Sequence, residues 1–499
     1  RDLRMSRGLG DVYKRQEDRS MIIKLIETVY QFLWGDLIHI PLPGGGSLGI
    51  SLLILLLFPA GIVFTIKTRF LPIRLFPDMV KVLTASNKKD KGEKSSLSSL
   101  QTLIVSTATR VGMGNLTGVV AAVSAGGAGA VFWMWVTALL GSSTAFIEAT
   151  LAQLHKEKDP LYGGYRGGPA YYIHHFMEEK QGKKKKHTLI AVLFAISGLI
   201  CWCGISQVVS NSVAESFNNA FHIPTIYTTI ILVIIAAVIV LRKNATVKVL
   251  DIVVPIMAVV YFLITIFVIV TNITSIPAVF ARIFKEAFGL RQVAAGGFGA
   301  VLMNGVKRGL FSNEAGSGSA PCAAAAADCE CPAQMGLVQA LGVFIDTIVI
   351  CSCTAMLMLL APQSMTDGLT GMSLLQTAMN YHLGSFGVIF IAVILWMFSF
   401  STFLGILFYA RSNVAYLFGD NWASQTAYKV LALVMLFIGG IQTYTFVWDL
   451  GDVGIGLMTI FNIFILYAMS GQAIKELKDY EADKKKNIEE RAFSLQEDE

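Results

Sequence analysis

Residues 311–319 read Phe311-Ser312-Asn313-Glu314-Ala315-Gly316-Ser317-Gly318-Ser319 and stand inside a segment, 296–320, that is long enough to cross a membrane as a helix. Glycines and polar residues interrupt this segment at the depth where a plain span would be apolar. Each N–H or C=O group freed there costs several kcal/mol unless it is buried in protein or lines a water-filled cavity. The sequence therefore predicts a broken helix in the interior of a membrane protein.

A second interruption lies in segment 98–125, where residues 109–115 read Thr-Arg-Val-Gly-Met-Gly-Asn. Two broken spans, five spans apart, are the pattern of a transporter site built from structural repeats. We expect repeat one at about 98–271 and repeat two at about 296–471, inverted relative to each other because each holds an odd number of spans. For Gly114 and Gly118 alone, a close contact between two helices is an equally good interpretation.

The composition favours the same class of protein. The chain has 499 residues, of which 54% are hydrophobic and only 15% are charged, whereas a soluble domain carries about 25% charged residues. The charged residues gather between long uncharged runs, so we predict an all-α polytopic membrane protein with 11 transmembrane helices. The predicted spans are 47–66, 98–125, 130–152, 188–212, 224–241, 250–271, 296–320, 335–360, 385–409, 427–447 and 452–471.

The loops indicate which way the chain faces, because Lys and Arg accumulate on the cytoplasmic side. Lys and Arg are abundant after spans 47–66 and 130–152 and after the last span, and they are missing between 98–125 and 130–152 and between 188–212 and 224–241. The N-terminus is therefore predicted outside and the C-terminus in the cytoplasm. The exception is the outside loop before 296–320, which holds Arg282, Lys285 and Arg291.

The ends of the chain have a different character. Residues 1–20 are polar and are predicted to be a non-native or disordered flank, and residues 21–46 form an amphipathic segment expected at the membrane interface. Residues 47–472 would be the transporter domain and residues 473–499 a charged cytoplasmic tail. The net charge of +6 is weak evidence for nucleic acid, which we do not expect as a partner. The seven cysteines suggest neither a disulfide framework nor a metal site.

The two breaks suit an amino acid and a monovalent cation together. Half-helix N-termini direct N–H groups at a carboxylate, and freed carbonyl oxygens can bind Na⁺. Ser399, Ser401 and Thr402 in span 385–409 offer hydroxyl groups, although a hydroxyl in a span usually bonds to its own helix. Gln207 in span 188–212 either faces the site or bonds a neighbouring helix, and the sequence does not separate the two.

Several stretches resemble the alanine or glycine:cation symporter family, also called the sodium:alanine symporter family. The resemblance covers about residue 32 to the end of the last span. It is most specific at residues 304–316, Asn-Gly-Val-Lys-Arg-Gly-Leu-Phe-Ser-Asn-Glu-Ala-Gly, and extends to residues 109–118, 129–138 and 167–173. It implies a LeuT-like fold of five plus five helices with one additional N-terminal helix, in the plasma membrane of a bacterium or archaeon. It also implies Na⁺-coupled uptake of a small neutral amino acid, with no cofactor besides the coupling ion; we expect a monomer.

By the same resemblance, the functional residues can be placed by number. The substrate pocket would be formed by Gly112, Met113, Gly114, Asn115, Gln207, Phe311, Ser312, Gly316, Thr402 and Ile406. The cation would lie between the carbonyl groups of Ala108 and Val111 and the hydroxyl groups of Ser401 and Thr402.

Two residues depart from the family pattern. Met113 stands where a threonine is common, and Ile406 stands where a tryptophan is usual. Because the loss of an indole enlarges the pocket, we expect a substrate somewhat larger than alanine as an alternative, such as glutamine. Coupling to protons in place of Na⁺ is the other alternative.

Charged residues near the breaks are candidates for a role because a charge in the membrane is costly. We predict a structural ion pair among Arg110, Arg308 and Glu314, with direct substrate contact as the alternative. Glu148 and Asp346 are interpreted as solvated residues near span ends. An intramembrane serine hydrolase would need a base, and no predicted span carries a histidine at mid-depth. A channel would conduct without a saturable coupled cycle.

Overall fold

The computed structural model describes residues 21, 23–42, 46–85, 102, 104, 110–242, 245–288, 297–329 and 331–497. It is a helical molecule in which seven apolar helical stretches are long enough to cross a membrane, counted over these residues, and three shorter apolar helices accompany them. The polytopic all-helical class is therefore confirmed. The long stretches are formed by α7 (Gly129–Leu154), α9 (Leu189–Phe221), α11 (Ala245–Thr271), α16 (Pro332–Val343) continued by η4 (Phe344–Cys351) and α17 (Ser352–Leu359), α20 (Ser385–Phe418), α21 (Trp422–Gly439) and α22 (Tyr444–Glu497).

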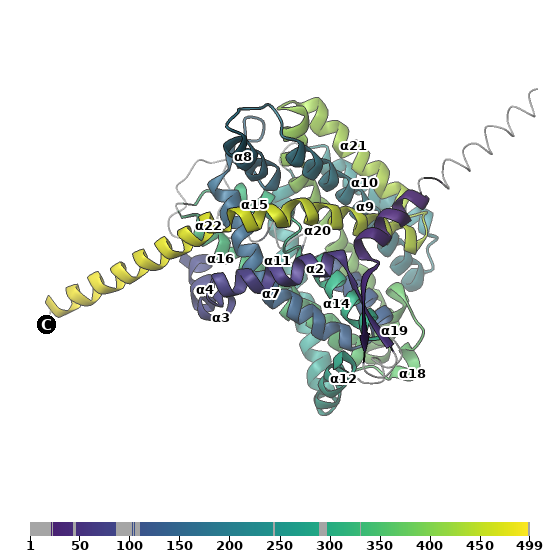
Figure 1. Cartoon of the computed structure of the whole chain (residues 1–499). Helices are drawn as coiled ribbons and strands as arrows, with labels where there is room; N and C mark the ends of the chain where they lie inside the picture. The colour runs from purple at the N-terminus through teal and green to yellow at the C-terminus, as the bar shows by residue number, and fades with distance from the viewer. Residues whose placement is uncertain are drawn as a thin grey trace, which may run out of the picture.

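Two helices organise the packing. α9 contacts α20, α21 and α22, whereas α7 contacts α16 and the broken helix α14 (Gly297–Asn313). Figure 1 shows α22 running across the molecule beside α2 (Leu52–Lys67) and projecting beyond it at its C-terminal end. A Cβ atom on Gly454 would lie 2.3 Å from the Cα atom of Cys201. Glycine at this position therefore permits α22 to approach α9 closely.

The first predicted span begins later in the chain than expected. Residues 23–34 are helical, but β1 (Asp36–Leu42) and β2 (Gly46–Ser51) then form an antiparallel hairpin. The predicted span 47–66 thus begins as a strand, and its helix α2 starts only at Leu52. The Ser51 side chain accepts the N–H of Ile54 at 3.3 Å, which is the helix cap that fixes this start. The residues predicted as a flank, 1–20, lie outside the described part.

Both predicted interruptions are present. Val111 and Gly112 are non-helical and lead into the π-helix η2 (Gly114–Gly118) and α6 (Val119–Gly126). Residues 314–320 are non-helical and separate α14 from α15 (Pro321–Ala325). The predicted turn between 98–125 and 130–152 is also confirmed, because Gly127 has a φ of +68° there. This conformation is readily adopted by glycine.

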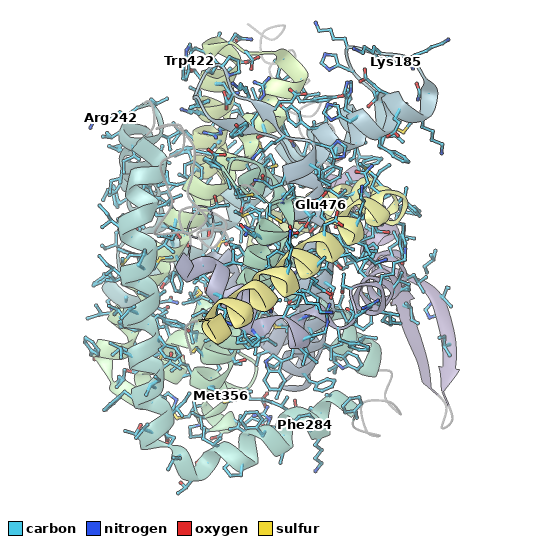
Figure 2. All side chains as sticks on the ribbon, turned by 90° about the vertical axis from the view of Figure 1, so that its left-hand side faces the viewer. Lys185, Arg242, Phe284, Met356, Trp422 and Glu476 are labelled. Carbon is cyan, nitrogen blue, oxygen red and sulfur yellow. The ribbon has the colours of Figure 1, made fainter. Side chains whose placement is uncertain are left out.

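Shorter elements join the spans. They are α3 (Leu71–Arg74), α4 (Phe76–Ala85), β3 (Glu157–Lys158), β4 (Tyr165–Arg166), α8 (Pro169–Gln181), α10 (Thr225–Val240), η3 (Ile273–Ser275), α12 (Ile276–Phe288), α18 (Gln363–Thr366) and α19 (Gly371–Leu383). Figure 2 shows Lys185, Arg242 and Trp422 toward one end of the molecule and Met356 and Phe284 toward the opposite end.

A pair of histidines links three elements where α7 ends. The Nδ1 atoms of His155 and His175 of α8 lie 3.2 Å apart, and Nε2 of His155 lies 3.0 Å from Oε1 of Gln472 in α22. Because an amide oxygen only accepts, Nε2 of His155 donates and its Nδ1 accepts the N–H of His175. The carboxylate of Glu157 lies 3.5 Å from Nε2 of His175. If Nδ1 of His155 were protonated, its N–H group would face the Nδ1–H group of His175 with no acceptor between them.

This contact predicts a pH dependence of stability. Burial lowers the pKa of His155 from its ordinary 6.5, against an opposing hydrogen bond from Gln472. Between the ordinary pKa and the lower folded pKa, the unfolded chain binds a proton that the folded chain does not, so the free energy of unfolding decreases as the pH falls below about 6.5. We expect the His155→Gln variant to show a flatter dependence in thermal unfolding from about pH 8 to about pH 5.5. The exposed His39→Gln variant is the control, and an unchanged slope in His155→Gln would contradict the prediction.

Candidate functional site

The first break is closed by a side chain of its own sequence. The backbone N–H of Gly112 donates to the carbonyl oxygen of Arg110 and to Oδ1 of Asn115, both at 2.8 Å. Asn115 lies in the π-helix η2 and is fully buried. The break therefore satisfies a freed N–H group with an asparagine, the residue that the sequence placed at mid-depth.

Asn115 also reaches the second break through a carboxylate. Its Nδ2 donates to Oδ1 of Asp346 at 2.8 Å, and the hydroxyl groups of Ser312 and Thr347 donate to Oδ2 at 2.9 and 2.6 Å. The exposed fractions of these four side chains are 0% or 1%. Cys351 completes the group, because its Sγ lies 3.2 Å from both Asn115 Nδ2 and Ser312 Oγ. We call Asn115, Ser312, Asp346, Thr347 and Cys351 the Asp346 cluster.

Asp346 was misjudged from the sequence as a solvated residue near a span end. It lies in η4, in the middle of the continuous helix over 332–359, and is fully buried. The available signal was its position as a carboxylate inside a long apolar run. Both Asn115 and Asp346 lie in π-helical turns, which are frequent at functional sites. Those turns were not predicted, because hydrophobic periodicity does not distinguish them from an α-helix.

Thr402 is brought to the first break, and Ser401 bonds within its own helix. The N–H of Met113 donates to Oγ1 of Thr402 at 3.0 Å. The hydroxyl of Ser401 donates to the carbonyl oxygen of Phe398 at 2.9 Å and lies 3.8 Å from Sδ of Met257 in α11. Val111 is buried beside the break. The predicted cation ligand Ala108 lies outside the described residues, so that site is only partly described.

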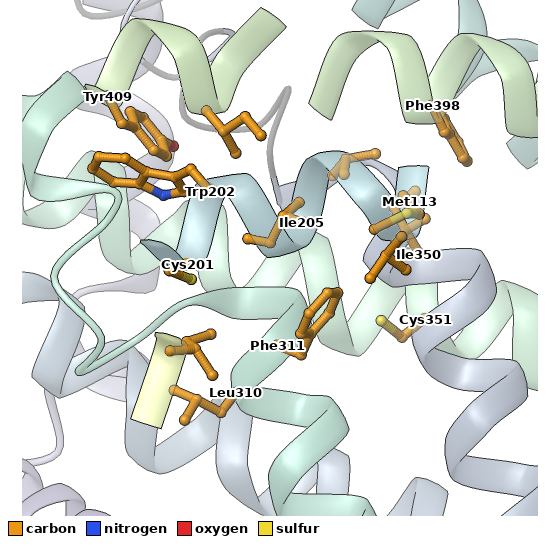
Figure 3. Close-up of a cluster of buried hydrophobic side chains, with 14 of the residues drawn as sticks. Met113, Cys201, Trp202, Ile205, Leu310, Phe311, Ile350, Cys351, Phe398 and Tyr409 are labelled. Atoms are coloured by element: carbon orange, nitrogen blue, oxygen red, sulfur yellow. The ribbon is translucent and has the colours of Figure 1, made fainter. Parts of the chain in front are cut away.

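Phe311 and Gly114 show how closely the breaks approach. A Cβ atom on Gly114 would lie 3.2 Å from the Cα of Ser312 and 3.6 Å from Cδ1 of Phe311. Gly114 therefore lies both beside the break and at a close contact between helices, so the two interpretations of this glycine are compatible. The Phe311 ring packs on Trp448 with centroids 4.8 Å apart. Figure 3 shows Phe311 with Met113, Ile350 and Cys351 among the buried side chains around the site.

Three other predicted pocket residues are buried but have different neighbours. Gln207 donates to Sδ of Met435 at 3.4 Å, and its Oε1 has no hydrogen-bond partner among the residues that the structure describes. Ile406 is fully buried in α20, one turn after Thr402. Gly316 is bound by Glu148 and Asn462, away from the Asp346 cluster.

Arg308, one member of the predicted ion pair with Arg110 and Glu314, has a partner that the prediction did not include. The guanidinium of Arg308 forms two bonds with the carboxylate of Asp452, at 3.1 and 2.8 Å, and Nζ of Lys307 lies 3.3 Å from the same group. Arg110 donates to Oε1 of Gln339 at 2.9 Å. Asp452 could have been noticed in the sequence as an acidic residue in the last apolar helix. Its pairing with Arg308, 144 positions away, could not be predicted from the sequence.

Two broken helices joined around a buried carboxylate in a polytopic helical protein are typical of a membrane transporter. The family follows from comparison. A family model described as the sodium:alanine symporter family matches residues 45–494. The chain belongs to this family, whose members are transporters.

Individual relatives agree with the family. The chain is 39% identical to the amino-acid carrier protein AlsT of Bacillus subtilis over 94% of both chains. It is 40% identical to the protein named "Probable sodium/glutamine symporter GlnT" of the same species, over 87% of this chain and 89% of that one. It is 34% identical to the sodium/alanine symporter AgcS of Methanococcus maripaludis over 92% of this chain and 97% of that one.

Proposed function

We propose that the chain is a Na⁺-coupled symporter that imports a neutral amino acid by alternating access. The observation that carries this proposal is the Asp346 cluster, in which side chains from both breaks meet at one buried carboxylate. Carboxylate, hydroxyl and amide oxygens are hard ligands that suit a small hard cation, whereas the thiol of Cys351 adds little to Na⁺ binding. One charge crossing about 100 mV supplies roughly 2.3 kcal/mol to drive accumulation.

The charge balance around the breaks supports one monovalent cation. Within the described residues, the buried charged groups of the broken segments and the helices packed on them are three cations and four carboxylates. With all seven groups ionised, the excess is one negative charge, and an uncompensated charge in a low-dielectric interior is costly. Binding of one Na⁺ would neutralise it. The groups are Arg110, Lys307 and Arg308 against Glu148, Glu314, Asp346 and Asp452.

The architecture that we propose is the LeuT-like five-plus-five inverted repeat with one additional N-terminal helix, 11 transmembrane helices in all. Repeat one would open with the break at Val111 and Gly112, and repeat two with the break after α14. The separation of Lys185, Arg242 and Trp422 from Met356 and Phe284 in Figure 2 supports a cytoplasmic and an outer end. The N-terminus would then lie outside and the C-terminus in the cytoplasm of a bacterial or archaeal cell, with the protein acting as a monomer.

Glutamine is the second candidate substrate beside alanine and glycine. Ile406 in place of an indole favours a larger pocket, and the name of one relative includes glutamine. The substrate would bind near Gly112–Asn115 and Thr402, where the N–H of Met113 already meets a hydroxyl. In this model of binding, freed N–H groups hold the substrate carboxylate.

Uptake into proteoliposomes tests the function. Labelled alanine, glycine and glutamine should each be assayed with Na⁺ and with choline at constant pH, and again with a proton gradient without Na⁺. We expect saturable uptake only with Na⁺. Uptake that is unchanged in choline would refute Na⁺ coupling, and dependence on the proton gradient alone would establish proton coupling in its place.

Substitution of Ile406 by tryptophan should shrink the pocket. Ile406 is fully buried, so the larger ring would occupy space beside Thr402 that a long side chain of the substrate needs. We expect competition by glutamine to fall by about tenfold or more relative to glycine, which corresponds to the 1–3 kcal/mol typical of such steric discrimination. Ile406→Leu, which conserves volume, is the control and should keep the wild-type preference. Equal competition by glutamine in Ile406→Trp would show that Ile406 does not limit substrate size.

A further inference from the structure

The non-helical segment after α14 is held by side chains outside the Asp346 cluster. Its backbone is left-handed at Glu314, Gly316 and Gly318, with φ of 56°, 92° and 87°. Such a segment cannot satisfy its own N–H and C=O groups by helical bonds, so other elements must supply partners. At Gly316 both groups are satisfied by side chains.

Those partners come from two different helices. Oε2 of Glu148, on α7, accepts the N–H of Gly316 at 2.9 Å, and Nδ2 of Asn462, on α22, donates to its carbonyl oxygen at 3.1 Å. The same Nδ2 donates to Oε1 of Glu148 at 2.6 Å. The hydroxyl of Tyr172, on α8, donates to Oδ1 of Asn462. Glu148 and Asn462 thus join α7, α8 and α22 at a single residue of the break.

The junction is fully buried, so its carboxylate carries a large desolvation cost. Glu148, Asn462 and Tyr172 are each 0% exposed. A neutral side chain could also accept one backbone N–H group, without that cost.

The surroundings limit how the segment can move. A Cβ atom on Gly318 would lie 2.7 Å from Cγ of Pro169 at the start of α8 and 2.8 Å from Cζ of Phe194 in α9. The segment and α8 are in close contact, so a movement of one displaces the other. If the segment moves, the hydrogen bonds of Glu148 and Asn462 to Gly316 must break, or both side chains must move with it.

We infer that Glu148 is a positioning residue for transport: it holds the non-helical segment of the second broken helix to α22 and α8 and controls the opening of the site, without contacting the substrate. The inference rests on the proposed symport function. It predicts that a change at Glu148 affects the transport cycle more than substrate binding. A residue that served only folding would affect both together.

The test compares binding with net uptake in Glu148→Gln and Asn462→Ala. Labelled alanine and glutamine should be measured for binding to the purified protein in Na⁺ and for net uptake into proteoliposomes. We expect net uptake to fall at least tenfold in each variant, while the dissociation constant changes by less than about threefold. Net uptake by the double variant should equal that of the more impaired single variant, because both substitutions disrupt the same junction.

Glu286→Gln is the matched control. Glu286 of α12 accepts the N–H of Ala128 at 2.6 Å, at the opposite end of α7, so it makes the same kind of bond without reaching a break. This variant should transport within about twofold of wild type. If Glu148→Gln does not fold, Asn462→Ala decides, because it retains the carboxylate of Glu148 and its bond to the N–H of Gly316.

The outcomes separate this inference from the proposed function. Failure of wild-type protein to take up any of the labelled amino acids would refute the symport function itself. Wild-type uptake with normal uptake in Glu148→Gln, a parallel loss of binding and uptake, or additive effects in the double variant would overturn the role of Glu148 alone.

Discussion

Replacement of Asp346 by asparagine should abolish Na⁺-dependent uptake. The substitution keeps the size of the side chain, and the hydroxyl groups of Ser312 and Thr347 can rotate to meet an amide, so the fold should survive. What is lost is the single negative charge that faces both breaks. Loss of one partner from a buried charge pair costs about 3–5 kcal/mol, or about 10²–10⁴-fold in Na⁺ affinity.

The measurement is Na⁺-dependent thermal stabilisation together with uptake as a function of Na⁺ concentration. Asp78→Asn is the matched control, since that carboxylate bonds Lys484 in the extension of α22, away from the breaks. The control should keep the wild-type dependence on Na⁺. If Asp346→Asn has the same half-saturating Na⁺ concentration as wild type, the cation does not bind at Asp346.

The breaks could be predicted from the sequence because their cause is local. Glycines and polar residues at 111–115 and 312–318 mark backbone that cannot continue an apolar helix, and the structure has non-helical residues at 111–112 and at 314–318. The spans of α7, α9 and α11 were likewise predictable, since long uncharged runs set helix length. These features depend on residues close together along the chain.

The partners of the buried charges could not be predicted in the same way. Asp346 meets Asn115 across 231 positions, and Glu148 meets Asn462 across 314. The sequence gives the approximate depth of each residue but not the face of the helix on which it lies, and the π-helical turns rotate that face. Glu148 and Asp346 therefore looked like residues at span ends, although both are fully buried.

Removal of Asp452 from its buried pair with Arg308 should strongly destabilise the protein. Its side chains are 6% and 1% exposed, and Lys307 also bonds the same carboxylate. Asp452→Ala would leave two buried cations without their counter-charge, so we expect a loss of about 3–5 kcal/mol in the free energy of unfolding. The Arg308 guanidinium also lies 4.2 Å from the Trp448 ring centroid, so tryptophan fluorescence should report the transition.

A more exposed ion pair shows how much of the expected loss of stability is due to burial. Arg282 and Glu286 on α12 lie 2.7 Å apart with side chains 29% and 22% exposed, and Arg282→Ala should cost roughly 1 kcal/mol or less. The double variant Arg308→Gln with Asp452→Asn removes both charges and keeps polar groups able to bond. It should recover part of the loss of Asp452→Ala, because the cost arises mainly from an unpaired buried charge and not from the absence of the bond. If Asp452→Ala unfolds at the wild-type temperature, Arg308 and Lys307 do not depend on this carboxylate, and the contact between α14 and α22 is maintained by apolar packing alone.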